Sequence, residues 1–200
     1  MNTLLSGYEK NTQILAFRVY AEQLDDSCRR QDHHKAHFAA LDLLSAALAE
    51  DFGVHHAVIR REGLGKPKLI HDFLHMNLSH CKGLAVAAVG RVPVGVDAEA
   101  PRQVKDALMR KVCTEQELAA IAAADDKMLA FSRFWTLKEA YAKFTGKGIA
   151  LDFSSLGFTL DPAPVFHHPA AESVQFYQIL LENQHVVSLC VPRGAYTVKK

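Results

Sequence analysis

The chain has 200 residues, of which 49% are hydrophobic and 22% charged, a composition typical of a folded globular protein with its own core. Its 23 Lys and Arg residues nearly balance its 22 Asp and Glu residues, so the net charge of +1 excludes a bulk attraction to nucleic acid or to an anionic membrane. Any anionic ligand must therefore be bound by a local cluster of basic residues.

The first half is expected to combine short strands with one long helix. In chain order we predict a loosely held polar segment (1–10), a strand (13–20), a basic loop or first helical turn (24–35), a helix (37–50), a short strand (57–61), a turn (63–68) and two paired strands (76–79 and 84–89). The helix is predicted because apolar residues recur at intervals of three or four, at Phe38, Leu41, Leu44 and Leu48. A tight turn over 81–83 is expected to join the paired strands.

The second half is expected to run from a strand through helices to further strands. We predict a strand (92–96), a helical section (102–144) and strands at 156–160, 173–181 and 185–191. Thr114 and Glu117 form a capping box, which begins a new helix inside the helical section. Asp125 or Asp126 is a second candidate cap, and Gly146 is the expected helix end. Because this order loosely repeats that of the first half, we place a boundary near residue 94.

Cysteine usage and the N-terminus indicate the compartment. The four cysteines are far apart and form no CxxC pair, which indicates reduced thiols rather than a disulfide framework or a zinc site. The N-terminus lacks a basic region followed by an apolar run, so no signal peptide is expected. No apolar stretch approaches the length of a membrane span. We therefore expect a cytoplasmic protein without nucleic-acid or membrane partners.

Two charged side chains within 134–148 (FWTLKEAYAKFTGKG) are difficult to explain by packing. Glu139 and Lys143 are four residues apart, so a helix places them on one face, and Trp135 lies one turn before Glu139 on that face. The apolar residues of the segment form a second stripe that would face a core, namely Phe134, Leu137, Tyr141 and Phe144. By itself, the charged pair could be a surface ion pair, so its interpretation depends on a second acidic cluster.

That second cluster is GVDAE at 95–99, at the end of an apolar run. In extended backbone Asp97 and Glu99 point to the same side, where they repel each other unless a cation or protons lie between them. Oxygen ligands of this kind suit Mg²⁺, and Glu139 would supply a third carboxylate. In isolation, the cluster could equally be two solvated acids that follow a strand.

Two shorter signals suit an anionic ligand. Ser79 and His80 are expected where a strand ends, which is a frequent place for ligand contacts. Lys66 and Pro67 are expected in a rigid turn that presents one ammonium group. Such a group would be a natural contact for a phosphate.

Four motifs together resemble the Sfp-type 4′-phosphopantetheinyl transferases. GVDAE (95–99) and WTLKEAYAKFTGKG (135–148) resemble the two-part signature of that family, while GKPKL (65–69) and HMNLSHC (75–81) resemble two further motifs. They occur in the family's order and cover roughly residues 60 to 150. The resemblance implies an α/β (α+β) fold of two similar subdomains, 1–94 and 95–200, packed as an intramolecular pseudo-dimer. The active site would lie in the cleft between them.

The resemblance also implies an enzyme and its chemistry. Such an enzyme transfers 4′-phosphopantetheine from coenzyme A to a serine hydroxyl of an apo carrier protein (acyl, polyketide or peptidyl carrier) and releases adenosine 3′,5′-bisphosphate. Mg²⁺ would be held by Asp97, Glu99 and Glu139, and coenzyme A would be the co-substrate. The implied catalytic residues are Glu139, Lys143 and His80; Glu139 is the candidate base, a role left open because it would also ligate the metal. The implied contacts to coenzyme A are Lys66, Pro67, Ser79, His80 and Lys143.

The chain departs from the family pattern in two places. Lys68 follows the Lys-Pro pair where many relatives have an aromatic or small residue. Phe38 follows a helix histidine where relatives commonly carry an arginine near the 3′-phosphate of coenzyme A, so Arg29, Arg30 or Lys35 would supply that charge. Two other functions stay open: another Mg²⁺-dependent phosphohydrolase or nucleotidyl transferase, and a non-catalytic carrier-binding homologue. A pseudo-dimer within one chain implies a monomer.

Overall fold

The computed structural model describes residues 1–10, 12, 14–25, 32–61, 66–70, 73–182, 184–194 and 196–200. Its elements are, in order, β1 (Asn2–Glu9), β2 (Leu15–Gln23), α1 (Asp32–Phe52), β3 (Ile59–Arg60), β4 (Lys68–Leu69), β5 (His75–Cys81), β6 (Leu84–Gly90), β7 (Gly95–Glu99), α2 (Asp106–Val112), α3 (Glu115–Ala123), α4 (Lys127–Thr145), the 3₁₀ helices η1 (Gly148–Ala150) and η2 (Phe153–Ser155), β8 (Gly157–Thr159), β9 (Val165–His167), the 3₁₀ helix η3 (Pro169–Glu172), β10 (Val174–Leu180), β11 (Val186–Pro192) and β12 (Tyr196–Lys199). The mixed α/β class is confirmed.

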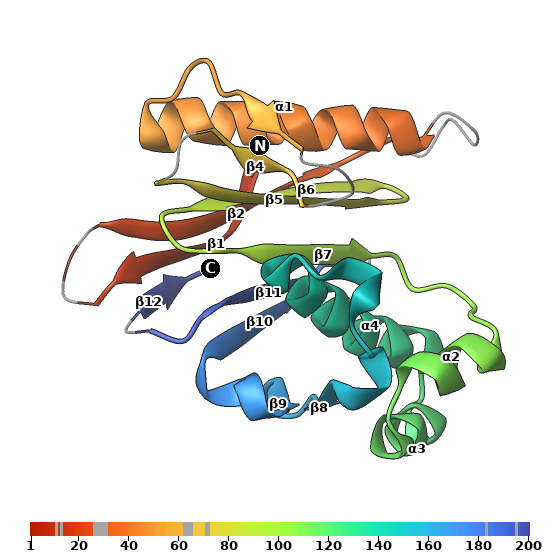
Figure 1. The fold of residues 1–200 in the computed structure, drawn as a ribbon. Helices are drawn as coiled ribbons and strands as arrows, with labels where there is room; N and C mark the ends of the chain where they lie inside the picture. Colours follow the sequence, from red (N-terminus) through yellow and green to blue (C-terminus); the bar gives the residue numbers. More distant parts are fainter. Residues whose placement is uncertain are drawn as a thin grey trace.

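Two sheets and two long helices form four layers (Figure 1). A five-stranded sheet, in the order β12-β1-β2-β6-β5, faces a three-stranded sheet, in the order β10-β11-β7, and an apolar core that includes Val86 and Val96 fills the space between them. Helix α1 covers the outer face of the first sheet through residues such as Leu48. Helix α4 covers the outer face of the second sheet through residues such as Phe134. Strands buried on both faces read as continuous apolar runs, which is why β6 is LAVAAVG.

The two halves share one antiparallel topology. In the first, β2 precedes α1, the small β3–β4 ladder and the β5–β6 pair, and the strand order is β2-β6-β5. In the second, β7 precedes α4, the small β8–β9 ladder and the β10–β11 pair, and the strand order is β7-β11-β10. This repetition is what a pseudo-dimer requires, although the boundary at residues 94 and 95 remains a proposal. Strand β12 crosses back to pair with β1 of the first sheet.

Local capping signals set the helix boundaries near the site. The predicted capping box is present at the start of α3, where Thr114 Oγ1 accepts from the Glu117 amide and the Glu117 carboxylate accepts from the Thr114 amide. Asp126 caps α4 by accepting from the Leu129 amide. The helix ends at Gly146, whose φ of 72° is the left-handed conformation that glycine adopts readily. These three sequence predictions are confirmed.

Other sequence predictions were wrong. The segment 1–10 is not loosely held but forms β1, with Leu5 1% exposed, because it pairs with both β2 and β12. Phe38 does not face the core: it is 61% exposed, and small residues such as Ala40 and Ala47 lie on the buried face of α1 instead. The strand predicted at 92–96 begins only at Gly95, two residues after Pro93, which has no N–H for a ladder. Strands β9 and β12 were not predicted.

Gly95 allows α4 to lie directly against β7. A Cβ at this position would clash with backbone atoms of Ala140 and Phe144 in α4, including Phe144 Cα at 2.7 Å. We therefore expect Gly95→Ala to destabilise the fold by about 3 kcal/mol, the upper end of overpacking effects, because backbone cannot move aside as a side chain can. Thermal denaturation checks this expectation, with Gly157→Ala as the comparison, since a Cβ there meets no atom nearer than 3.6 Å. A melting temperature for Gly95→Ala no lower than that of Gly157→Ala would contradict it.

Candidate active site

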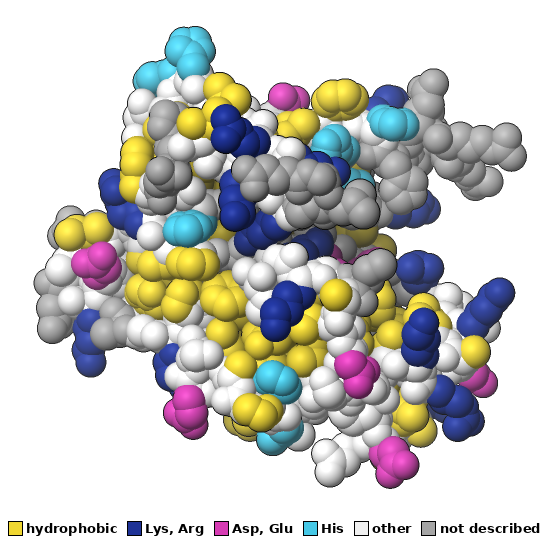
Figure 2. All heavy atoms as spheres, in the orientation of Figure 1, with side chains coloured by type: hydrophobic (Ala, Val, Ile, Leu, Met, Phe, Trp, Pro, Cys, Tyr) yellow, Lys and Arg dark blue, Asp and Glu magenta, His cyan; other side chains and the backbone are white. Residues whose placement is uncertain are grey.

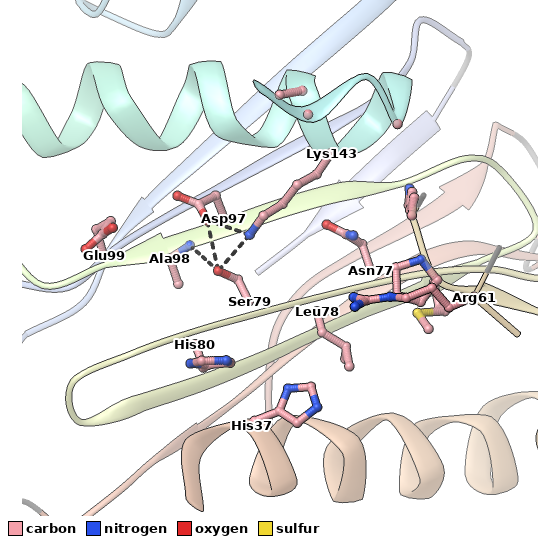
Figure 3. A pocket seen from close by; sticks show the side chains of 16 residues that line it. His37, Arg61, Asn77, Leu78, Ser79, His80, Asp97, Ala98, Glu99 and Lys143 are labelled. Atoms are coloured by element: carbon pink, nitrogen blue, oxygen red, sulfur yellow. Dashed lines mark hydrogen bonds and ion pairs between the residues drawn. The ribbon is translucent and has the colours of Figure 1, made fainter. Parts of the chain in front are cut away.

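A pocket of about 430 Å³ lies between the two halves (Figure 3). Strand β5 lines it from the first half, and β7 and α4 line it from the second. Seven of the predicted site residues are brought together in its wall: Lys66, Pro67, Ser79, His80, Asp97, Glu99 and Lys143. Thus residues from separate motifs meet in one cavity.

Side chains of β5 join the two sheets at this pocket. Asn77 Oδ1 accepts from the Val96 amide at 2.8 Å, and Ser79 Oγ accepts from the Ala98 amide at 3.1 Å. Both side chains are buried, and both amides belong to β7. Strands β5 and β7 belong to different sheets, so these side chains replace ladder bonds and fix where Asp97 lies.

Asp97, Ser79 and Lys143 form the polar centre of the pocket (Figure 3). Lys143 Nζ donates to Asp97 Oδ1 at 2.7 Å and to Ser79 Oγ at 3.1 Å, while the Ser79 hydroxyl lies 2.9 Å from the same Asp97 oxygen. Asp97 is 5% exposed, so its charge is largely removed from solvent. The ammonium group of Lys143 on α4 therefore compensates the buried carboxylate of Asp97 on β7. The other side of that carboxylate is left facing the pocket.

Glu139 belongs to the same electrostatic group, although its side chain is not part of the pocket wall. Burial raises the pKa of Glu139 to about 7; the charges of Asp97 and Glu99 also raise it, and Lys143 lowers it. Burial likewise raises the pKa of Glu99, with a further increase from Asp97 and a decrease from Arg102, Lys143 and a hydrogen bond to Trp135. The predicted triad therefore consists of neighbours whose charges repel one another.

The donor set of this triad fits a hard divalent cation. Carboxylate oxygens are the ligands that Mg²⁺ takes, and Asp97 Oδ2 is buried without a hydrogen-bond partner. Among the residues with a described placement, no three His, Cys, Asp or Glu side chains already converge on a common point. The triad is thus a group of adjacent carboxylates with one free oxygen on Asp97, and a cation would relieve the repulsion between them.

Basic groups line the rest of the pocket. Lys66 Nζ donates to the Val94 carbonyl at 2.6 Å, and burial lowers the pKa of Lys66 to about 8, with Lys143 and Lys68 lowering it as well. The His80 ring lies 5.6 Å from the His37 ring of α1, in a T-shaped arrangement. Arg61 and His37 also line the pocket, and neither was predicted. Figure 2 shows Lys and Arg side chains gathered where the two halves meet.

Of the three basic residues proposed for the 3′-phosphate, the structure describes only Lys35. Lys35 is exposed on α1 and does not line the cavity. Arg29 and Arg30 lie outside the described residues, as does Gly65 of the GKPKL motif. His37 and Arg61 are therefore the basic residues, beyond those predicted, that the described structure places there.

Sequence reasoning also missed a buried ion pair beside the site. Lys138 and Glu117 have fully buried side chains, with Lys138 Nζ 2.6 Å from Glu117 Oε2. A signal was available, because Lys138 lies four residues after Phe134 and three before Tyr141, on the arc of α4 that faces the core. A charged residue on that arc requires a buried partner.

The helices of the described part of the chain include none long and apolar enough to cross a membrane.

Comparisons with known proteins agree with the motifs. The family described as "4′-phosphopantetheinyl transferase superfamily" matches residues 93–190. The 4′-phosphopantetheinyl transferase psf-1 of Bacillus pumilus is 35% identical over 49% of this chain and 43% of that protein. HetI, the 4′-phosphopantetheinyl transferase of a Nostoc strain, is 32% identical over 71% of this chain and 65% of that protein. Sfp, the 4′-phosphopantetheinyl transferase of Bacillus subtilis, is 26% identical over 76% of this chain and 70% of that protein.

The site and the comparisons agree on one class: the chain is similar to the 4′-phosphopantetheinyl transferase superfamily over residues 93–190, and to HetI over 71% of its length. Its likeness to Sfp confirms the Sfp-type resemblance of its motifs. The chain spans 43% and 65% of the length of the first two relatives, so their activity is not transferred to it directly.

Proposed function

We propose that this protein transfers 4′-phosphopantetheine from coenzyme A to a serine hydroxyl of an apo carrier protein, with Mg²⁺ as cofactor. The observation that carries the proposal is the pocket between the halves, where Lys143 compensates Asp97 beside two further carboxylates with raised pKa values. Such a pocket offers acidic ligands for a cation and ammonium groups for a diphosphate. The buried free thiols of Cys81, Cys113 and Cys190 support a reducing cytoplasmic location, and we propose a monomer.

The chain's own residues bind the diphosphate and hold the proton in this scheme. Lys143 would bind a diphosphate oxygen and stabilise the charge that develops on the departing phosphate, while Lys66 and His80 would hold the nucleotide side. The serine oxygen forms a bond to the phosphorus of the phosphopantetheine, and the bond to adenosine 3′,5′-bisphosphate breaks. Asp97, Glu99 and Glu139 would hold Mg²⁺, which when bound neutralises diphosphate charge.

The serine proton needs an acceptor near neutral pH. Glu139 has a pKa raised to about 7, which is the range in which a general base works best at that pH. A carboxylate that also ligates the metal is a weaker base. We therefore propose that Glu139 acts as metal ligand and as general base one after the other, or fills each role only in part.

Incubation with coenzyme A and a panel of apo carrier proteins tests the proposed function. A mass gain of one phosphopantetheine on a carrier is the expected result. Free phosphopantetheine without carrier modification would instead indicate a phosphohydrolase. Carrier binding without any turnover in the presence of Mg²⁺ would indicate a non-catalytic carrier-binding homologue.

The start of α2 offers a basic rim for an acidic carrier surface. Arg102, Lys105 and Arg110 are exposed, and Arg102 lies 4.0 Å from Glu99 of the pocket. We expect the double charge reversal Arg102→Glu and Lys105→Glu to raise the KM for carrier protein about tenfold and to leave the KM for coenzyme A unchanged. The reason is that charges at the rim of an interface mainly change the rate at which the two proteins associate. Steady-state kinetics with each substrate varied in turn measures both constants.

A second charge reversal controls for net charge. Lys199→Glu with Lys200→Glu makes the same change at exposed residues at the end of the chain, beyond the pocket wall. This control should leave both KM values at their original level. An equal rise in the carrier KM in the two double variants would attribute the effect to net charge and remove α2 as the docking surface.

A further inference from the structure

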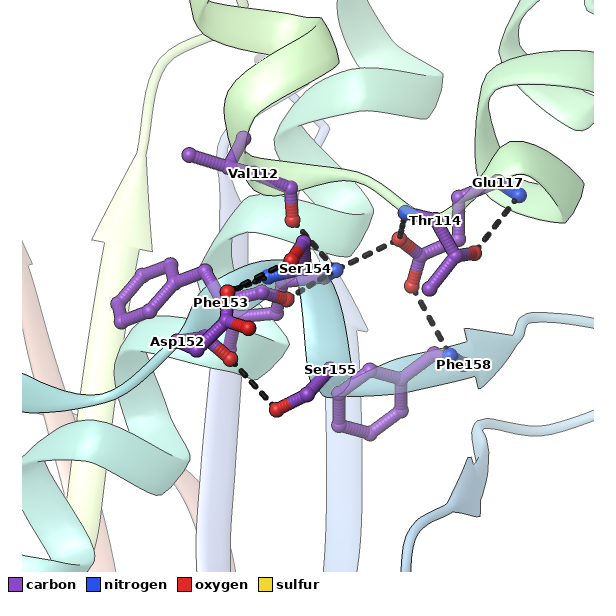
Figure 4. A network of polar contacts seen from close by, with 9 residues as sticks. Val112, Thr114, Glu117, Asp152, Phe153, Ser154, Ser155 and Phe158 are labelled. Carbon is purple, nitrogen blue, oxygen red and sulfur yellow. Dashed lines mark hydrogen bonds and ion pairs between the residues drawn. The ribbon is translucent and has the colours of Figure 1, made fainter.

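The ammonium group of Lys138 makes all its hydrogen bonds to protein atoms, because its side chain is fully buried. Its side chain is 0% exposed, and its Nζ donates to Glu117 Oε2 at 2.6 Å, to the Val112 carbonyl at 2.7 Å and to the Phe153 carbonyl at 2.9 Å. An ammonium group has three hydrogens, so all of them are used. Its partners Val112, Glu117 and Phe153, labelled in Figure 4, lie at the end of α2, at the start of α3 and in η2, so Lys138 connects α4 to these three elements.

Glu117 extends this network to a further strand. Its Oε2 also accepts from the Thr114 amide at 2.8 Å, and its Oε1 accepts from the Phe158 amide of β8 at 2.9 Å. The Glu117 side chain is 0% exposed as well. The pair therefore links α4 to four separate segments through bonds of fixed direction, which apolar contacts do not have.

Stability alone does not account for a charged pair at this place. Removing two ions from water costs free energy that their attraction only partly returns, so an apolar pair of similar volume is commonly as stable or more stable. The surroundings are apolar, with Leu137 and Phe158 of the same core almost fully buried. What the charged pair supplies, and apolar residues would not, is a defined rotation and axial position of α4.

The position of α4 decides the geometry of the pocket. Lys138 directly precedes Glu139, and consecutive residues point about 100° apart around a helix, so one faces α2 and α3 while the next faces the carboxylate group. One turn further, Lys143 meets Asp97 at 2.7 Å. One turn earlier, Trp135 hydrogen bonds Glu99. A small rotation of α4 would displace all three side chains relative to β7.

We propose that Lys138 and Glu117 are positioning residues for the transfer reaction: their buried ion pair fixes α4 so that Glu139 and Lys143 face Asp97. This inference rests on the proposed function. Neither residue touches the pocket, so each acts through α4. Because Lys66, Ser79 and His80 of the pocket do not lie on α4, a displaced α4 should impair turnover more than the binding of coenzyme A.

The double variant Lys138→Met with Glu117→Gln tests the proposal. The double variant removes both charges and keeps the volumes of the two side chains. The amide oxygen of the Gln introduced for Glu117 can still accept from a backbone N–H. We expect a folded protein whose kcat falls about 10- to 100-fold, the effect of a misplaced catalytic group, while the KM for coenzyme A rises less. Trp135, the chain's single Trp, lies on α4 between Phe131 and Phe153, so its emission maximum should shift.

A matched control removes another ion pair of the same length. Arg18 and Asp51 lie 2.6 Å apart and join β2 to α1, away from α4, so Arg18→Met with Asp51→Asn should keep kcat and the Trp135 emission. A folded Lys138/Glu117 variant with unchanged kcat and emission would overturn the proposal. If that variant does not fold, Glu117→Gln alone takes its place; failure of both to fold would assign the pair to folding rather than positioning. A wild-type protein that modifies no carrier would instead refute the proposed function.

Discussion

Replacing Glu139 by Gln is expected to reduce carrier modification about 10²- to 10⁴-fold while it increases the stability of the folded protein above pH 7. The activity falls because Gln can neither accept the serine proton nor supply a negative ligand to a divalent cation. The fold is retained, because Gln has the shape of Glu and the site is half-buried rather than sealed. Few substitutions remove function and add stability together, so the combination is a specific test.

The gain in stability follows from the raised pKa. Burial and the neighbouring carboxylates raise the pKa of Glu139 from 4.5 to about 7 in the folded protein. Between those two values the folded state binds more protons than the unfolded state, so the free energy of unfolding decreases as the pH rises. Above pH 7 the full penalty of the buried charge, about 3 kcal/mol, is present in the wild type and absent in Glu139→Gln.

Two measurements check this prediction. Mass spectrometry of a carrier protein follows the rate of modification, and denaturant unfolding at pH 4.5 and at pH 8 follows stability without added metal. The stabilities of the two proteins should agree at pH 4.5 and separate at pH 8. Glu172→Gln, at an exposed position in η3, serves as the control and should change neither quantity. Equal stability at pH 8 would show that Glu139 is not confined near other carboxylates.

The parts of this structure that sequence predicted are those set by neighbours in the chain. The capping box of Thr114 and Glu117 and the C-terminal Gly146 of α4 depend on residues three or four positions away, and both were located correctly. The β5–β6 pair was also expected, because a tight turn with Gly83 at a φ of 79° joins two apolar runs. The four motifs that resemble the family likewise contain most of the residues that line the pocket.

The parts that sequence did not predict depend on distant partners. Strand β1 is polar enough to resemble a loose end, and it is ordered by pairing with β12 at the opposite end of the chain. The pattern within α4 could indicate that Lys138 is buried, but it does not contain the carbonyl groups of α2 and η2 that bind its ammonium group. The contact of Lys143 with Asp97 spans 46 positions, so its existence could be expected from the motifs but not its geometry.

Replacing Lys143 by Met is expected to reduce kcat/KM for coenzyme A about 10²- to 10³-fold and to move the acid limb of the pH profile upward. The first effect has the size of losing one charged group that stabilises developing negative charge. The second effect arises because Lys143 lowers the pKa values of both Glu139 and Glu99. Without its ammonium group these carboxyl groups keep their protons to higher pH. The ionised, active form of the site is therefore reached only at a higher pH than in the wild type.

Rate measurements from pH 5.5 to 9 distinguish these two effects, since the acid limb reports ionisation and the plateau reports charge stabilisation. Lys147→Met removes an exposed ammonium group just beyond the C-terminus of α4 and should preserve both limb and plateau. A reduced plateau with an unmoved acid limb would mean that Lys143 contacts the substrate without controlling the carboxylates. The same result would separate Lys143 from Asp97 in the working enzyme, because the 2.7 Å ion pair between them is what couples ammonium charge to the acidic group.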